Sequence, residues 1–218
     1  MTFQTIEAIP APLLEDNVDT DVIFPARFLL LLDREGLGQY AFAERRRAGD
    51  DFILDRVPYN DSAVLVAGRN FGSGSSREQA VWALEDLGIR AIIARSFGEI
   101  FFANAFRNGL LPIVLDGPPM DRVEAAAEAA EPITVDLERQ EIRLGDGPPI
   151  GFDVPPNRRR ALMAGLDEVD AILTDDLADI VAYEEKVASE RPWTTIAPAK
   201  LKAIRAPQPV VAARERED

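Results

Sequence analysis

Short apolar runs separate stretches of helical spacing in the first half of the chain. The runs at residues 62–67, 90–94 and 110–115 are rich in aliphatic and β-branched side chains, which is typical of buried strands. In the two intervening stretches apolar positions recur at helical spacing, and the stretches end near Gly88 and Gly109, a residue type that favours helix termination. This order of strands and helices predicts two right-handed βαβ units and a parallel sheet.

The remaining pattern predicts further elements on both sides of this region. They are an opening strand and turn at 3–14, an alanine-rich helix at 121–131, a hairpin of strands at 133–137 and 141–144, and mostly helical structure at 156–186. Prolines and charges become frequent from residue 189. We therefore expect one domain over residues 1–195 and a flexible polar tail over residues 196–218.

The turn between the first buried strand and the following helix carries the candidate chemistry. It contains the glycines Gly72 and Gly74, a pair of serines and Arg77. The backbone N–H groups of a helix's first turn lack partners within the helix, so a helix start attracts anions. Arg77 adds a positive charge and a planar fork that matches a carboxylate. The pattern indicates a site for a small carboxylate or phosphate.

The same turn has a simpler interpretation as a helix cap. Ser75 and Glu78 have the S-x-x-E spacing of a capping box, in which the serine caps the helix and the glutamate reaches back to it. Ser96 and Glu99 repeat this spacing before the next helix, where a cap alone suffices. A cap does not account for the glycine pair, nor for an arginine in a first turn, where the helix dipole disfavours cations.

Nucleotide and nucleic-acid binding are poorly supported. A P-loop ends in Gly-Lys-Ser/Thr, and residues 68–79 contain no lysine. In the dinucleotide fingerprint the third glycine position would hold Arg77, which is too bulky for close helix–strand packing, and the acidic residue that binds ribose is missing after the next strand. The net charge of −14 disfavours a nucleic-acid partner.

Composition excludes several catalytic classes. Of the 218 residues, 47% are hydrophobic, which fits a globular protein with a sizeable core. The chain has no cysteine and no histidine, so it cannot by itself build a disulfide, a zinc site, a Ser-His-Asp triad or an iron–sulfur cluster. No apolar run approaches the roughly 18 residues of a membrane span, and residues 1–14 do not resemble a signal peptide, so we expect a cytoplasmic protein.

Residues 70–78, Asn-Phe-Gly-Ser-Gly-Ser-Ser-Arg-Glu, resemble the signature turn of the 3-isopropylmalate dehydratase small subunits. They are similar, more distantly, to the swivelling domain of aconitase. Ordered matches continue upstream through residues 17–21, 23 and 25, and downstream through 83–88, 95–97, 100–101, 104, 110–112, 165–167 and 182–184. The resemblance covers residues 8–187, which is most of the chain.

The resemblance implies an α/β fold, the layered swivelling β/β/α domain with a mixed, partly parallel sheet. It also implies one subunit of a hydro-lyase that interconverts 2-isopropylmalate and 3-isopropylmalate through an alkene in leucine biosynthesis. Such enzymes use a 4Fe-4S cluster, whose iron polarises the departing hydroxyl. Because the chain has no cysteine, no metal or cofactor is expected on it alone, and the cluster is expected on a large partner subunit. The expected ligands are that subunit and a small hydroxy-dicarboxylate, without nucleic acid or membrane.

The resemblance also implies roles for individual residues. At the matching positions Ser75 is the catalytic base, as an alkoxide, Ser76 helps to hold substrate, and Arg77 grips a carboxylate. An ordinary hydroxyl hardly ionises, so we expect free helix N–H groups and Arg77 to activate Ser75. Asp21 matches a loop that reaches the active site and is expected there as an acid, although residues 17–21 alone are typical of an Asx-type turn.

Specificity is expected from the segment that follows this loop. Arg27 is a candidate for binding a second carboxylate, although many relatives have lysine one position earlier, where this chain has Ala26. In the leucine run at 29–32, at least two side chains are expected in the core. Leu30 and Leu31 are expected to line a pocket for a branched alkyl group.

The sequence departs from the family at Gln79, where relatives usually have histidine. A neutral amide forms hydrogen bonds but cannot carry a proton at pH 7. Three functions therefore stay open. They are the small subunit of isopropylmalate dehydratase, the small subunit of a sister hydro-lyase of citramalate, dimethylmalate or homoaconitate type, and a non-catalytic paralogue kept for binding or regulation.

Overall fold

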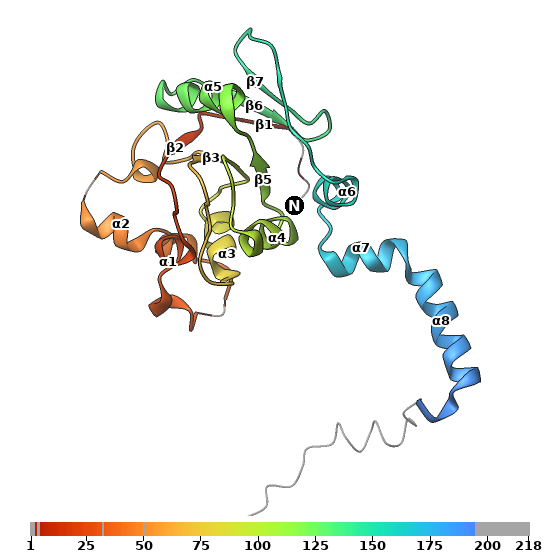
Figure 1. Ribbon diagram of the computed structural model, residues 1–218. Helices are drawn as coiled ribbons and strands as arrows, with labels where there is room; N and C mark the ends of the chain where they lie inside the picture. Colours follow the sequence, from red (N-terminus) through yellow and green to blue (C-terminus); the bar gives the residue numbers. More distant parts are fainter. Residues whose placement is uncertain (1–2, 4, 32, 50, 195–218) are drawn as a thin grey trace, which may run out of the picture. The chain divides into compact units, whose positions relative to one another are not determined.

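The computed structural model describes residues 3, 5–31, 33–49 and 51–194. The chain divides into two units, Met1–Ala171 and Ile172–Asp218, and the first unit contains both sheets (Figure 1). The expected polar tail at residues 196–218 and the expected domain end at residue 195 lie outside the described residues, so both stay predictions.

A parallel sheet with strand order β2-β3-β4-β5 forms the centre of the first unit. Its strands are β2 (Ala11–Leu13), β3 (Val64–Ala67), β4 (Ala91–Ala94) and β5 (Leu111–Val114). The last three correspond to the three predicted apolar runs, and their pairing confirms the predicted parallel sheet. The opening segment adds β2, which runs parallel to β3 with Leu13 beside Ala67.

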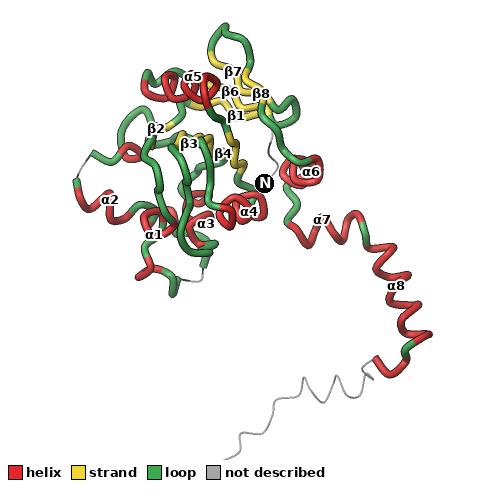
Figure 2. Tube along the Cα trace, viewed as in Figure 1, coloured by secondary structure: helices red, strands yellow, loops and turns green. Residues whose placement is uncertain are grey.

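A second sheet is antiparallel and has the order β1-β6-β7-β8. Its strands are β1 (Thr5–Ala8), β6 (Ile133–Asp136), β7 (Glu141–Leu144) and β8 (Ile150–Gly151). β6 and β7 form the predicted hairpin. The layered β/β/α architecture is confirmed, with the parallel and antiparallel strands in separate sheets instead of one mixed sheet (Figure 2).

Helices connect and cover these strands. They are α1 (Thr20–Ile23), α2 (Ala43–Ala48), α3 (Gln79–Asp86), α4 (Glu99–Arg107), α5 (Gly117–Glu128), α6 (Pro156–Ala164), α7 (Glu168–Asp175) and α8 (Leu177–Glu190), with 3-10 turns at Ala26–Phe28, Gly38–Tyr40, Ile53–Asp55 and Pro192–Thr194. As predicted, α3 and α4 connect consecutive parallel strands. α5 begins earlier than predicted because the Asp116 carboxylate caps it, accepting from Gly117 N at 2.9 Å.

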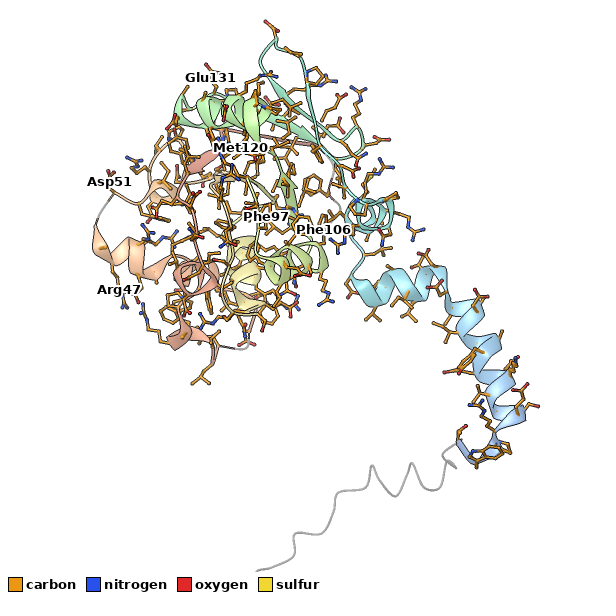
Figure 3. All side chains as sticks on the ribbon, in the orientation of Figure 1. Arg47, Asp51, Phe97, Phe106, Met120 and Glu131 are labelled. Carbon is orange, nitrogen blue, oxygen red and sulfur yellow. The ribbon has the colours of Figure 1, made fainter. Side chains whose placement is uncertain are left out.

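Both faces of the parallel sheet are buried, which explains the unbroken apolar runs. Leu65 and Ile92 pack in a cluster with residues of α1, α3 and α4, whereas Val66 and Ile93 face a cluster with α5 and the antiparallel sheet. Figure 1 shows α3 and α4 on one side of the parallel strands and α5 with β6 and β7 on the other. Met120 of α5 is fully buried in the second cluster (Figure 3). Truncating such a side chain to alanine typically costs about 2–5 kcal/mol.

The second unit contains α8 and the last residues of α7. Leu173, Leu177 and Val181 form an exposed apolar stripe along these helices, and the acidic residues Asp176 and Asp179 are exposed as well. Within the part of the chain that the structure describes, no helix combines the length and the apolar character needed to cross a membrane.

Candidate active site

The loop between β3 and α3 lies at the carboxyl end of the parallel sheet, where the neighbouring loops hold it. Gly72 N donates to the carbonyl of Val18 at 2.7 Å, which joins the loop to the segment after β2. Phe71 N donates to the carbonyl of Ser96 at 3.0 Å, which joins it to the segment after β4. Ligands of open α/β sheets usually bind at the carboxyl ends of the strands, so the fold supports a site here.

The glycine pair has a structural cause in this loop. Gly72 has a φ of +71°, and a Cβ atom at this position would overlap the ring of Phe101 on α4. Gly74 has a φ of +92°, and a Cβ atom there would lie 3.5 Å from Cβ of Asp19. The first glycine allows close packing against α4, and both allow a backbone conformation that other residues adopt at a cost.

The predicted capping box at Ser75 and Glu78 is wrong. Glu78 occupies the N-cap with helical dihedral angles (φ −69°, ψ −28°), and α3 begins at Gln79. The Glu78 carboxylate accepts from Asn108 Nδ2 at 2.9 Å instead of reaching back to Ser75. Because the helix starts beyond Ser75, the expected activation of Ser75 by helix N–H groups does not match this geometry.

The second predicted capping box, at Ser96 and Glu99, is also wrong. Gly98 is the N-cap of α4, and the Ser96 hydroxyl accepts from Asn70 N at 2.8 Å. In both cases the serine is bonded to a segment distant in sequence. Ser75 and Ser96 therefore connect segments that are distant in sequence and do not cap α3 or α4.

Ser75 contacts Thr20, the first residue of α1. Oγ of Ser75 lies 3.1 Å from Oγ1 of Thr20, and the Thr20 hydroxyl also donates to the Ser75 carbonyl at 3.2 Å. Thr20 is 1% exposed, whereas Ser75 is an exposed residue. The candidate base therefore belongs to an exposed residue, and its Oγ contacts a buried hydroxyl.

Arg77 and Asp21, both predicted from the sequence, are brought together. Nη1 of Arg77 forms an ion pair with Oδ1 of Asp21, and their side chains are 17% and 56% exposed, respectively. Nη1 of Arg77 is buried, and Asp21 is its partner among the described residues. A substrate carboxylate that takes the place of Asp21 can form the bidentate pair for which the guanidinium fork is suited.

Residues 17–21 do contain an aspartate whose side chain bonds nearby backbone, as a local turn requires, but this residue is Asp19 and not Asp21. Asp19 caps α1, and its Oδ1 accepts from Val22 N at 2.8 Å. Asn17 and Asn70, both with positive φ, are joined by an amide hydrogen bond of 2.9 Å. Asp21, two residues after the cap, is exposed and contacts Arg77.

Ser76 and Gln79 complete the predicted turn. Ser76 is exposed and lies between the candidate base and Arg77 in the chain. Gln79 is half-buried at the first position of α3. The residues that follow Ser75 thus carry a hydroxyl (Ser76), a guanidinium (Arg77) and, at the start of α3, an amide (Gln79).

Arg27 is engaged elsewhere. Its guanidinium forms an ion pair with Glu44 and lies 4.4 Å from the ring centroid of Phe28. Within the described part of the chain, no hydrogen bond or ion pair connects Arg27 with Ser75 or Arg77. In this arrangement its charge is paired with the Glu44 carboxylate, and both side chains are exposed.

Leu30 and Leu31 lie on the surface. They are 90% and 37% exposed. They line an open depression of about 490 Å³ together with Asp33, Glu35, Gly36, Leu37, Gln39 and Tyr40. Leu29 is half-buried against the core, as expected for part of the run, and Leu32 lies outside the described residues. The proposed role of the two exposed leucines in substrate binding is compatible with this exposure but is not tested by it.

Sequence reasoning missed Thr20 and a network of charges at the same edge of the sheet. Arg95, directly after β4, donates to both carboxylate oxygens of Glu124 (2.9 and 2.6 Å) and to Asp121 (2.7 Å), and it contacts Asp116 at 3.2 Å, as Arg69 does at 3.0 Å. The bonds to Glu124 and Asp121 raise the pKa of Arg95 above its usual range. The Gly117 N–H, followed by the two arginines, lowers the pKa of Asp116. In the sequence, a charged residue follows each parallel strand within two positions, and this pattern could have indicated the network.

Comparison with known proteins identifies the family. The Aconitase C-terminal domain family matches residues 1–118, and the LeuD_N family matches residues 121–156. A 3-isopropylmalate dehydratase small subunit from Ruegeria sp. is 49% identical over 199 residues, which cover 88% of this chain and 98% of the relative. The chain belongs to the 3-isopropylmalate dehydratase small-subunit family. A small subunit from Rhodopseudomonas palustris is 47% identical over 198 residues, with the same coverage of both chains.

A solved structure of this family supports the fold. The 3-isopropylmalate dehydratase from Methanocaldococcus jannaschii is 30% identical and superposes with a TM-score of 0.60, covering 82% of this chain and 99% of that chain. The resemblance recognised in the sequence is therefore confirmed, together with the swivelling α/β domain. Around the small-subunit motif, and throughout the described residues, no group of three or more acidic side chains is arranged to hold a metal ion.

Proposed function

We propose that this chain is the small subunit of a hydro-lyase that interconverts 2-isopropylmalate and 3-isopropylmalate by dehydration and rehydration, in the cytoplasmic pathway to leucine. The family membership supports this reaction over that of a sister hydro-lyase. The observation that carries the proposal is that one turn presents both Ser75 and Arg77. Each contacts a residue of α1: Ser75 contacts Thr20, and Arg77 contacts Asp21. A non-catalytic paralogue would not require this arrangement.

In the proposed reaction Ser75 acts on the substrate carbon next to a carboxylate. Its oxygen, as the alkoxide, forms an O–H bond with the proton of that carbon, the C–H electron pair becomes the alkene bond, and hydroxide departs from the neighbouring carbon. Arg77 binds the carboxylate through its planar fork, and Ser76 adds a hydrogen bond. Asp21 is the acid of the site and keeps the Arg77 guanidinium in place until substrate arrives.

The residues of this chain do not fit an iron–sulfur cluster, because the chain contains no cysteine. We propose that a larger partner subunit holds the 4Fe-4S cluster and that activity requires both subunits. The chain alone should then be colourless and inactive. Stoichiometric iron and sulfide in the isolated chain, or turnover without a partner, would contradict this division of roles.

The test is reconstitution with a cluster-bearing large subunit, using Ser75→Ala and Ser62→Ala. Loss of the catalytic base should lower kcat by roughly three orders of magnitude or more, while the lost hydrogen bond should cost only about 1 kcal/mol of unfolding free energy. Ser62 is a matched control, since its buried hydroxyl lies 2.7 and 2.8 Å from the carbonyl oxygens of Ile9 and Val64, outside the site. A Ser75→Ala complex with near wild-type turnover would remove Ser75 from the mechanism.

A further inference from the structure

We propose that Thr20 is a positioning residue that donates a hydrogen bond to the Ser75 oxygen when this oxygen is negatively charged. The inference rests on the proposed function, because it requires Ser75 to act as the base. It assigns a catalytic contribution to a residue outside the signature turn, which stands 55 positions from Ser75 in the sequence.

The backbone around Thr20 fixes the position of its hydroxyl. Thr20 N donates to the carbonyl of Ser73 at 2.9 Å, and the preceding residue, Asp19, caps α1 through its side chain. The side chain is β-branched, so few rotamers are available, and at 1% exposure water does not compete for its oxygen. A donor held in this way needs little reorganisation when charge develops beside it.

Each of the two hydroxyls, of Thr20 and Ser75, has a single hydrogen, and this determines which of them donates. A threonine hydroxyl has one hydrogen, and the contact with the Ser75 carbonyl at 3.2 Å requires it, because a carbonyl oxygen can only accept. Oγ1 of Thr20 can then only accept from the Ser75 hydroxyl, which lies 3.1 Å away. In the resting state Ser75 is therefore the donor, and its proton lies on the side of Thr20, away from the exposed face.

When solvent water takes the proton of the exposed Ser75, the direction of this contact reverses without movement of a heavy atom. Rotation about the Cβ–Oγ1 bond of Thr20 carries its hydrogen from the Ser75 carbonyl to the Ser75 alkoxide. A hydrogen bond to an ionised acceptor is about twice as strong as one to a neutral acceptor. The buried hydroxyl thus stabilises the alkoxide from behind and leaves its outer face open to the substrate proton.

The experiment compares Thr20→Val, Thr20→Ala and Thr20→Ser in the full chain reconstituted with the large subunit. Removing one donor to a developing oxyanion typically costs about 10²- to 10³-fold in kcat, so we expect this loss for valine and alanine with KM changed by less than about threefold. Serine should restore kcat to within about tenfold of wild type. The limb of the kcat–pH profile that reports ionisation of the base should move to higher pH in the valine variant.

Urea unfolding of each isolated variant separates these effects from a structural defect. Ser62→Ala, which also removes a buried hydroxyl, should lose stability without losing kcat. If valine does not fold at this position, alanine carries the same comparison. A kcat within threefold of wild type for the hydroxyl-free variants, or an equal loss in the serine variant, would overturn the inference. Full activity of Ser75→Ala would instead overturn the proposed function, so the two failures are distinguishable.

Discussion

Replacing Gly72 by alanine tests why the signature turn needs its first glycine. An added Cβ would overlap the Phe101 ring, and this ring cannot move away easily because it is 2% exposed. It packs edge-to-face on Phe71 at 5.4 Å between ring centroids and stacks on Phe97 at 6.3 Å (Phe97 is labelled in Figure 3). The substitution therefore forces either the loop or the aromatic cluster to shift.

The expected cost has two parts. Alanine in a left-handed conformation costs about 1–2 kcal/mol, and overpacking a filled core costs about 1–3 kcal/mol, so Gly72→Ala should lower the unfolding free energy by about 2–5 kcal/mol. Gly74→Ala has the same type of strain, but its Cβ would have 3.5 Å to the nearest atom, so only about 1–2 kcal/mol is expected. Gly151→Ala, in β8 with no atom within 4 Å of the added Cβ, should stay within about 0.5 kcal/mol of wild type.

Urea unfolding followed by tryptophan fluorescence provides the assay. The chain has two tryptophans, and Trp193 lies in the second unit, so all variants carry Trp193→Phe. Trp82 then reports on the first unit alone, from a position on α3 where its indole donates to Asn108 at 2.9 Å. Equal midpoints and m-values for Gly72→Ala and Gly74→Ala would refute the steric argument, since only the strain term would remain.

Three further predictions concern the site and its surroundings. Arg77→Lys should lower kcat/KM by about tenfold or more, because lysine keeps the charge but loses the planar fork, whereas Arg69→Lys on the same loop should stay near wild type; equal values for both would make Arg77 a simple charge. The reconstituted complex should prefer isopropylmalate and smaller alkylmalates to homocitrate-type tricarboxylates in kcat/KM, because Leu30 and Leu31 are expected to line an apolar pocket that rejects an unpaired carboxylate; the opposite preference would mean that Arg27 sets specificity and would point to a sister hydro-lyase. Folding lowers the pKa of Asp116 below its usual value of 3.8, so the ionised carboxylate stabilises the fold above pH 3.8 and this contribution is lost as pH falls through the folded pKa. The Tm difference between wild type and Asp116→Asn should therefore close below pH 3.8. A difference that stays constant with pH would contradict this.

The parallel sheet was predictable because its strands are buried on both faces. A run such as residues 63–67 contains no polar side chain, and the helices between such runs have clear apolar spacing. The division into two sheets was not predictable, because strand order depends on which edges pair in space. Thr5 pairs with Asp136 and Ala11 with Leu65, and neither pairing leaves a local signal.

The candidate site was predicted in its residue types but not in its contacts. The S-x-x-E spacing is a short-range pattern, and it favoured a helix cap as one interpretation of Ser75. The structure instead gives Ser75 a partner 55 positions away, and it gives Glu78 a partner 30 positions away on α4. Long-range hydrogen bonds of this kind stabilise the fold by about as much as a helix cap, roughly 1 kcal/mol, and no single sequence window contains both partners.

The contact between Arg77 and Asp21 bears on how an acidic protein can bind an acidic substrate. A net charge of −14 repels a dicarboxylate at long range, so binding depends on local groups. Because Asp21 is 56% exposed, its ion pair contributes only about 0–1 kcal/mol and can be given up cheaply. Arg77 is far less exposed than Asp21, so a substrate carboxylate bound to it through two hydrogen bonds would gain more there than the exposed Asp21 loses. In the proposed function Asp21 is therefore a replaceable counter-ion, which keeps the guanidinium in place in the empty subunit and yields it to the substrate.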